Sequence, residues 1–226
     1  MKNVIITGAT GNLGKAVTKK FIESNCRVIA ADAQTTPSST NHNLDSIQVD
    51  LSNEASARSF VESSIQKYKT IEAGIMLVGG FTMGKVEDTS IDDLKKQYAL
   101  NFETAYNIAR PLFTHMMQNN SGRLIFVGAR PALDSSAGKN MIAYALSKSL
   151  IFKFAELLNA AAKGKNVTAT VFVPSTIDTP QNRASMPDSN PDNWVKAEQI
   201  AELMEMVVSE KGSVLRETVF KVYNNA

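Results

Sequence analysis

The sequence predicts a single α/β domain, a doubly wound parallel sheet of about seven strands with helices on both faces. Three observations support this fold class. Short runs rich in valine and isoleucine alternate along the chain with segments of helical periodicity. The first of these runs ends in a glycine-rich turn that opens a helix. The length of 226 residues suits one domain, residues 1–226, with a sizeable core.

The first unit is a strand at residues 4–6, a turn, and a helix that extends to about residue 24. The turn contains Gly8, Gly11 and Gly14. Glycine permits a tight turn and lets backbone N–H groups approach a pyrophosphate at the positive end of a helix. The flanking strand and helix favour a nucleotide-binding loop over three glycines that coincide by chance.

The second strand, residues 27–31, ends at Asp32, 18 residues after Gly14. A carboxylate at this point can accept hydrogen bonds from the ribose of an adenosine and repels a 2′-phosphate. No arginine or lysine follows directly, because Ala33 and Gln34 come next. Asp32 therefore favours NAD, with NADH preferred over NADPH, although a polar residue also commonly ends a strand without binding anything.

The remaining elements follow the same alternation, with polar stretches between them. Further strands are expected at 47–49, 72–78, 123–127, 167–173 and 217–223. Helices are expected at 54–68, 91–118 (interrupted near residue 101), 142–163 and 197–209. Loops are expected at 35–43 and 128–140, and a longer, proline-containing substrate loop at about 175–196.

Glycines and polar residues follow most of these strands directly. They include Asp32, Asp50, Gly79, Gly80 and Pro174. In a parallel sheet the carboxyl ends of the strands meet at one edge, and ligands bind there near the change in strand order. We therefore expect these residues to gather around one nucleotide site.

Tyr144 and Lys148 lie four residues apart in a segment that reads as a helix. Their side chains would share one face of that helix. An ammonium group beside a phenol favours the phenolate and lowers the tyrosine pKa, so the pair could donate or accept a proton near neutral pH. A Tyr-x-x-x-Lys pattern is short, and a chance match is the alternative.

Composition excludes several classes of protein. The formal net charge of +2, from 24 basic and 22 acidic residues without a basic stripe, argues against nucleic acid as a partner. One cysteine, Cys26, excludes an internal disulfide, and with two histidines no metal site is expected. The N-terminus has no signal-peptide h-region and no apolar run spans a membrane, so we expect a cytoplasmic protein that acts on a small molecule.

Together these residues resemble the short-chain dehydrogenase/reductase family, with its Rossmann-type fold, over the whole chain. The resemblance implies catalytic roles for Tyr144, Lys148 and Asn101. It implies that the cofactor is bound by Gly8, Thr10, Gly11, Asn12, Leu13, Gly14, Asp32, Asp50, Leu51, Gly79, Gly80, Tyr144, Lys148, Pro174, Thr176 and Thr179. It also implies a homodimer or homotetramer that pairs helices near 97–119 and 142–163.

One departure from the family pattern is informative. The family usually has a serine at the end of the fifth strand, where this chain has Gly128, Ala129 and Arg130. Segments 128–134 and 178–187, with Trp194 beyond them, resemble the dihydropteridine reductase branch, which also lacks that serine. The candidate substrate residues are then Ala129, Arg130, Asn182, Arg183, Met186 and Trp194.

This resemblance implies an NAD(P)H-dependent oxidoreductase that reduces a quinonoid dihydropterin or a similar conjugated imine or carbonyl compound. A conjugated acceptor delocalises developing charge within its own ring, so a lost serine donor costs less than it would with a plain ketone. Two alternatives stay open. The chain could reduce another carbonyl or quinone, or it could bind a dinucleotide as a sensor without catalysis.

Overall fold

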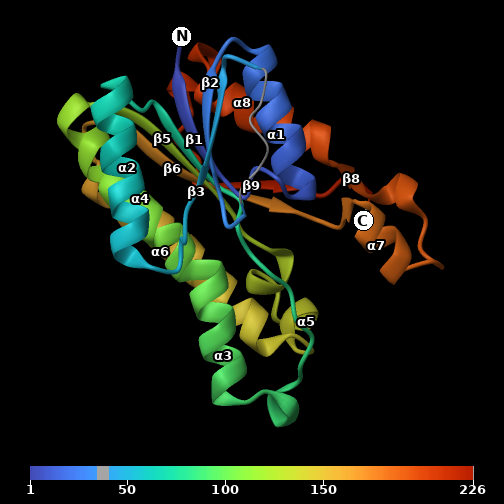
Figure 1. Cartoon of the computed structure of the whole chain (residues 1–226). Coiled ribbons are helices and arrows are strands. Elements are labelled where there is room, and N and C mark those ends of the chain that lie inside the picture. Colours follow the sequence, from blue (N-terminus) through green and yellow to red (C-terminus); the bar gives the residue numbers. More distant parts are fainter. Residues whose placement is uncertain (35–40, 226) are drawn as a thin grey trace.

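The computed structural model describes residues 1–34 and 41–225, and its centre is a seven-stranded sheet in which every pairing is parallel (Figure 1). The strand order is β3-β2-β1-β4-β5-β6-β9. The strands are β1 (Asn3–Thr7), β2 (Arg27–Asp32), β3 (Leu44–Gln48), β4 (Ala73–Met76), β5 (Ser121–Val127), β6 (Asn166–Pro174) and β9 (Val219–Val222). The order reverses between β1 and β4, which places a crevice beyond the carboxyl ends of those two strands.

Helices cover both faces of the sheet, because alternate residues of each buried strand point to opposite sides. Ile5 of β1 belongs to the core under α2 (Glu54–Tyr68), α4 (Thr104–Asn119) and α6 (Ile142–Ala161). Its neighbours Val4 and Ile6 belong to the core under α1 (Asn12–Glu23) and α8 (Ala197–Val208). Figure 1 shows these two groups of helices on opposite sides of the sheet.

The long helix expected at 91–118 is interrupted near the predicted place. It comprises α3 (Ile91–Tyr98), a π-helical turn at Ala99–Glu103, and α4. Ser90 begins α3 with a capping box, in which its hydroxyl accepts from Asp93 N and the Asp93 carboxylate accepts from Ser90 N. A π turn inserts one extra residue per turn and often marks a functional position. Asn101 stands in this one.

Two of the expected segments need correction, a strand and a loop, and a third segment is only partly described. The third strand begins at Leu44 rather than residue 47, because Leu44 pairs with Val28 and the register continues to Asp32. The expected loop 35–43 lies partly outside the described residues, at 35–40. The expected loop 128–140 contains a 3₁₀ turn, Arg130–Ala132, and a short helix, α5 (Ser135–Gly138).

The expected substrate loop also has structure of its own. Two short strands, β7 (Ile177–Asp178) and β8 (Val195–Lys196), pair in parallel and enclose the short helix α7 (Pro180–Ser185). Thr179 caps α7 by accepting a hydrogen bond from Asn182 N, and Pro180 occupies its first position. In Figure 1, α7 lies to one side of the sheet while α3 and α5 lie below it.

No helix in residues 1–34 and 41–225 is both long and apolar enough to cross a membrane.

Candidate active site

The glycine loop is bound tightly to the carboxyl end of the sheet. Gly8, at φ +68°, donates its N–H to Ala31 O at the end of β2. A Cβ on Gly14 would lie 2.0 Å from Gly8 O, so only glycine allows the turn to close against the start of α1. A Cβ on Gly8 would lie 3.2 Å from Val78 Cγ2, which places the loop against the chain that leaves β4, at the reversal of strand order. The glycine loop is thus a tight turn at the start of α1, packed against the chain that leaves β4.

Asp32 is held by the same loop. Its Oδ1 accepts hydrogen bonds from Thr10 N (3.2 Å) and Thr10 Oγ1 (3.0 Å), and the residue is only 5% exposed. Its Oδ2 is buried and has no hydrogen-bond donor in the described part of the chain. A cavity of about 540 Å³ adjoins Asp32 and Thr10 and continues along the flank of α1. A carboxylate oxygen without a donor fits a site for a ligand that carries hydroxyl groups.

Lys148 lies at the centre of the same edge. It is 6% exposed, and its Nζ donates to Val127 O (2.8 Å) at the end of β5. A Cβ on Gly79 would lie 3.1 Å from Lys148 Nζ and 2.7 Å from Asn101 Oδ1, so the chain after β4 passes directly over both side chains. Gly79, Asn101 and Lys148 therefore lie together in the structure.

The pKa values differ from the sequence prediction. Burial raises the pKa of Tyr144 to about 12, whereas we expected Lys148 to lower it. Burial also lowers the pKa of Lys148 to about 8, and the ammonium is directed to Val127 O. The prediction counted the neighbouring charge and omitted the loss of water around the phenol. At a pKa of about 12 the Tyr144 phenol is protonated at neutral pH and can donate a proton.

Asn101 is fixed by bonds from three segments. Its Oδ1 accepts from Gly80 N (2.9 Å), and its Nδ2 lies within bonding distance of Gly80 O, Gln97 Oε1 and Ser147 Oγ. Ser147 in turn donates to Tyr144 O (2.8 Å). Asn101 thus ties the chain after β4 to the helix of Tyr144 and Lys148. The motif pattern pointed to Asn101 and did not include Gln97, although Gln97 stands four residues before Asn101, a helical spacing at which side chains meet.

The end of β5 carries no serine side chain. Gly128 and Ala129 are buried there, and a Cβ on Gly128 would lie 2.6 Å from the Phe152 ring. Ser135 and Ser136 are exposed on α5 beyond this point. The end of β5 therefore offers no side-chain hydroxyl where the family pattern usually has one.

Other predicted cofactor residues lie at the same edge of the sheet and form hydrogen bonds with neighbouring residues of the chain. Asp50 Oδ1 accepts from Ser52 N and Ser52 Oγ, which lower the pKa of the Asp50 carboxyl. Leu51 is buried, and its carbonyl accepts from Asn107 Nδ2. Pro174 ends β6, while Thr176 O pairs with Val195 N as β7 begins.

The candidate substrate residues are mostly engaged within the chain. Arg183 forms a two-pronged ion pair with Asp178, Nε to Oδ1 at 2.6 Å and Nη2 to Oδ2 at 2.8 Å. Asn182 Nδ2 donates to Ile177 O (2.8 Å), and Arg130 lies over the Tyr223 ring at 5.5 Å. Trp194 is 5% exposed, which favours packing over substrate contact. Met186, which follows α7, is partly exposed and stays a candidate.

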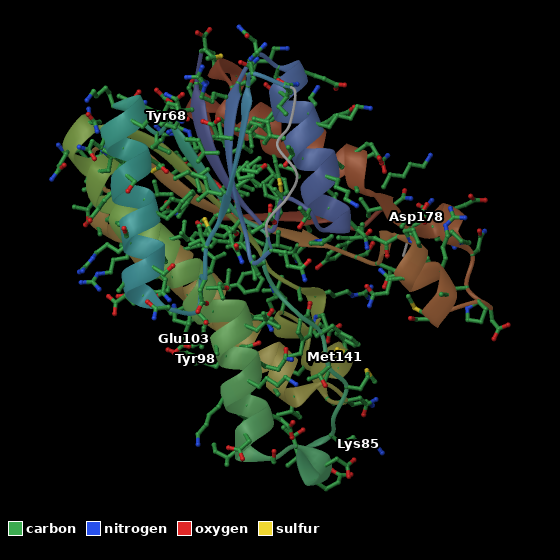
Figure 2. The ribbon with its side chains drawn as sticks, in the orientation of Figure 1. Tyr68, Lys85, Tyr98, Glu103, Met141 and Asp178 are labelled. Atoms are coloured by element: carbon green, nitrogen blue, oxygen red, sulfur yellow. The ribbon has the colours of Figure 1, made fainter. Side chains whose placement is uncertain are left out.

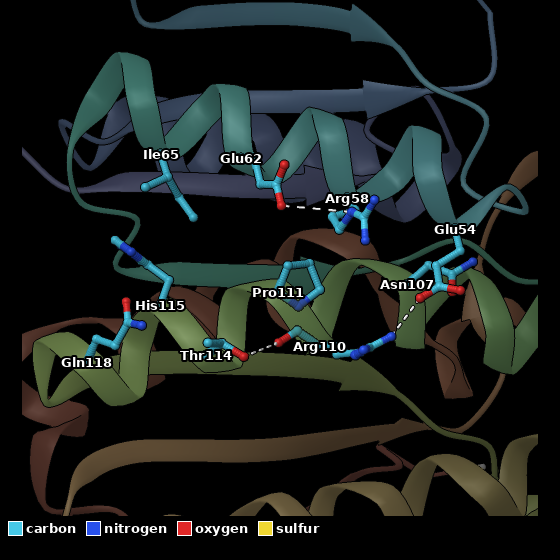
Figure 3. Close-up of a pocket in the computed structure, with 10 residues that line it drawn as sticks. All are labelled: Glu54, Arg58, Glu62, Ile65, Asn107, Arg110, Pro111, Thr114, His115 and Gln118. Carbon is cyan, nitrogen blue, oxygen red and sulfur yellow. Dashed lines mark hydrogen bonds and ion pairs between the residues drawn. The ribbon is translucent and has the colours of Figure 1, made fainter.

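A separate cavity of about 340 Å³ lies between α2 and α4 (Figure 3). Its charges are paired internally, Arg110 with Glu54 (2.6 Å) and Arg58 with Glu62 (3.8 Å). His115 there accepts from Ile71 N through Nε2, and burial lowers its pKa. No cluster in residues 1–34 and 41–225 has the ligands for a metal ion.

Comparison with known proteins decides the family. The sequence profile of the short chain dehydrogenases matches residues 2–190. The chain belongs to the short chain dehydrogenase family. This short chain dehydrogenase is therefore of the oxidoreductase type, and the Tyr144–Lys148 helix, the glycine loop and the seven-stranded sheet have the expected arrangement.

Individual relatives are distant. A dihydropteridine reductase from Dictyostelium discoideum is 27% identical to this short chain dehydrogenase over 204 residues, which cover 89% of this chain and 85% of that protein. A 3-oxoacyl-(acyl-carrier-protein) reductase from Chlamydia trachomatis is 23% identical over an alignment that spans 98% of this chain and 95% of that protein. The crystal structure of a 3-ketoacyl-(acyl-carrier-protein) reductase from Brucella melitensis complexed with NADH shares the fold, with TM-score 0.85 at 18% identity, over 98% of this chain and 96% of that one.

Proposed function

We propose that this protein is an NADH-dependent reductase of a conjugated imine or carbonyl compound, with a quinonoid dihydropterin as the leading substrate. One observation carries the choice of substrate class: Ala129 replaces the serine that would polarise a plain carbonyl group. A conjugated ring spreads developing charge over several atoms and needs less help from a hydroxyl donor. The similarity to a dihydropteridine reductase over 89% of the chain supports the same class.

The residues at the sheet edge fit a nicotinamide dinucleotide. The glycine loop would hold the pyrophosphate, and Asp32 Oδ2, which lacks a donor in the described residues, would accept from a ribose hydroxyl. A nicotinamide cofactor supplies a hydride when bound. The negative charge of Asp32 disfavours a 2′-phosphate, which favours NADH.

Tyr144 would donate the proton that accompanies reduction. Its pKa of about 12 keeps the phenol protonated across the neutral range, as a proton donor requires. Lys148 has a pKa of about 8 and is mostly charged at pH 7, so it can hold a ribose hydroxyl through the rest of its donor capacity. Asn101 fixes Gly80 beside the pair and keeps the edge of the site in place.

Two other functions make different predictions. A reductase of simple carbonyl compounds would resemble the Chlamydia trachomatis relative and would turn over plain ketones. A dinucleotide sensor would bind NADH tightly without consuming it. The presence of Tyr144, Lys148 and Asn101 together favours catalysis, because a sensor has no need of a proton donor.

A substrate panel separates the three. We expect the purified protein to oxidise NADH in the presence of quinonoid dihydropterin faster than in the presence of several simple ketones, and NADPH to be used less well. Comparable initial rates with the ketones would favour the second function. NADH binding without turnover of any member of the panel would favour the sensor.

Replacing Asp32 by serine is expected to move the cofactor preference toward NADPH. Loss of one nearby negative charge should change the ratio of NADH to NADPH affinity by about tenfold or more. Fluorescence titration of both cofactors measures the ratio. Asp45→Ser removes the same charge from β3, where Asp45 pairs with Lys67, and should leave the ratio unchanged. An equal shift in both variants would assign the effect to net charge alone.

A further inference from the structure

Phe81 has an unusual position for a large apolar residue. It follows Gly80 directly, and its side chain is 60% exposed. The Phe81 and Tyr144 rings are 5.1 Å apart at their centroids, with an angle of 78° between their planes. An aromatic ring thus stands beside the proposed proton donor with most of its surface uncovered.

The chain on both sides of Phe81 is fixed to the site. On one side, Gly80 N and Gly80 O both bond to the Asn101 side chain. On the other, Gly84 N donates to Asn140 O (2.8 Å), and Ile142 N donates to Gly84 O (2.9 Å) at the start of α6. Lys85 and Met141, labelled in Figure 2, mark the part of the molecule where these segments pass each other. The chain is therefore fixed by hydrogen bonds on both sides of Phe81, and Phe81 lies exposed between them.

The angle between the rings suggests what Phe81 would contact. A flat ring stacked on Phe81 would be parallel to it and nearly perpendicular to the Tyr144 ring. Such a ring would place its face against the exposed apolar surface of Phe81, which adjoins the Tyr144 ring. Offset stacking of this kind is favourable for conjugated heterocycles, and a small aliphatic ketone gains little from it.

We propose that Phe81 is a substrate-binding residue that selects planar conjugated acceptors by stacking against their ring. This inference rests on the proposed function and deepens it, because it names a residue whose contact with the substrate would favour planar conjugated compounds. Ala129 has no hydroxyl to donate a hydrogen bond to the carbonyl group of a plain ketone. Phe81 offers an exposed aromatic face, on which a conjugated ring can stack and a small ketone cannot.

Four variants test the role of the ring. Phe81→Ala removes the side chain, and Phe81→Leu keeps an apolar group but removes the aromatic face. Phe81→Tyr keeps the aromatic face and should rescue binding. Val86→Ala, at a 71% exposed residue of the same connection between β4 and α3, is the matched control.

We expect KM for quinonoid dihydropterin to rise about tenfold in Phe81→Ala and Phe81→Leu, and to stay within about twofold in Phe81→Tyr and Val86→Ala. The dissociation constant of NADH, measured by fluorescence titration, should be unchanged in all four. An unchanged KM in Phe81→Leu would overturn the proposal, and so would a parallel rise in the NADH dissociation constant, which would assign Phe81 to the cofactor.

A binding experiment keeps this test separate from that of the proposed function. The fully oxidised pterin is planar and cannot accept the hydride in the same way, so its binding to the protein with NAD⁺ is measured without turnover. Binding that weakens about tenfold in Phe81→Leu and recovers in Phe81→Tyr supports the role of Phe81 even if the wild type reduces no dihydropterin. Equal binding by wild type and Phe81→Leu would overturn it.

Discussion

Tyr144→Phe is expected to lower kcat for reduction by about 10²- to 10⁴-fold, the usual range for loss of a general acid. Phenylalanine keeps the ring and its edge contact with Phe81 but removes the hydroxyl that donates the proton. The dissociation constant of NADH should change little. Initial-rate kinetics together with NADH titration measure both quantities.

The control for this variant is Tyr106→Phe. Tyr106 lies on α4, where its ring contacts Phe102 and Phe154 rather than the sheet edge. This variant should keep wild-type kcat. If Tyr144→Phe also kept wild-type turnover, the proton-donor role of Tyr144 would be wrong.

Lys148→Met is expected to abolish most activity and yet not to destabilise the protein at neutral pH. Activity, as kcat/KM, should fall by about 10²-fold or more, because the site loses a charged donor and the partner of Val127 O. The free energy of unfolding should not fall with the activity, because the substitution also removes a buried charge. Burial lowers the Lys148 pKa from 10.5 to about 8, so the folded state holds the charge at a cost of about 3 kcal/mol at neutral pH.

The sign of the pH dependence follows from that shift. Between about pH 8 and 10.5 the unfolded chain keeps a proton on Lys148 that the folded chain has lost, so stability rises with pH across this window. Below about pH 8 the full penalty is present. Methionine has no such charge, although it leaves Val127 O without its donor, at a cost of roughly 1–3 kcal/mol.

Denaturant unfolding of both proteins at several pH values measures this effect. The wild type should gain about 3 kcal/mol relative to Lys148→Met between pH 7 and 10.5. Lys153→Met, which removes an exposed lysine of the same helix, should show no such trend. A difference between wild type and Lys148→Met that is constant over this range would contradict the depressed pKa.

Much of the site was predictable because its residues follow strands. Asp32, Gly79 and Gly80 stand at or just after strand ends, and parallel strands bring their ends to one edge whatever the details of packing. Tyr144 and Lys148 were predictable as a pair because helical spacing is local. Asn101 could be expected to interrupt its helix, and it lies in the π turn.

Other features depend on tertiary packing and left no local signal. Gln97 is the exception, because it stands four residues before Asn101 on the expected helix, a spacing at which side chains meet. Phe81 contacts Tyr144 although the two residues are far apart in the chain, near the bonds of Gly84 to the start of α6. The Tyr144 pKa was predicted in the wrong direction because spacing gives a neighbour's charge but not the water that burial removes. Trp194 stood in a segment that reads as a loop, and it is buried directly before β8.

The ratio of NADH consumed to tetrahydropterin formed tests most directly whether the protein reduces a quinonoid dihydropterin with NADH. Wild-type protein is mixed with limiting NADH and excess quinonoid dihydropterin, and both the NADH consumed and the tetrahydropterin formed are measured. We predict one tetrahydropterin for each NADH, at a rate that falls about 10²-fold or more in Tyr144→Phe. NADH that binds but is not consumed, or that is consumed equally fast by the Tyr144→Phe protein, would contradict the account.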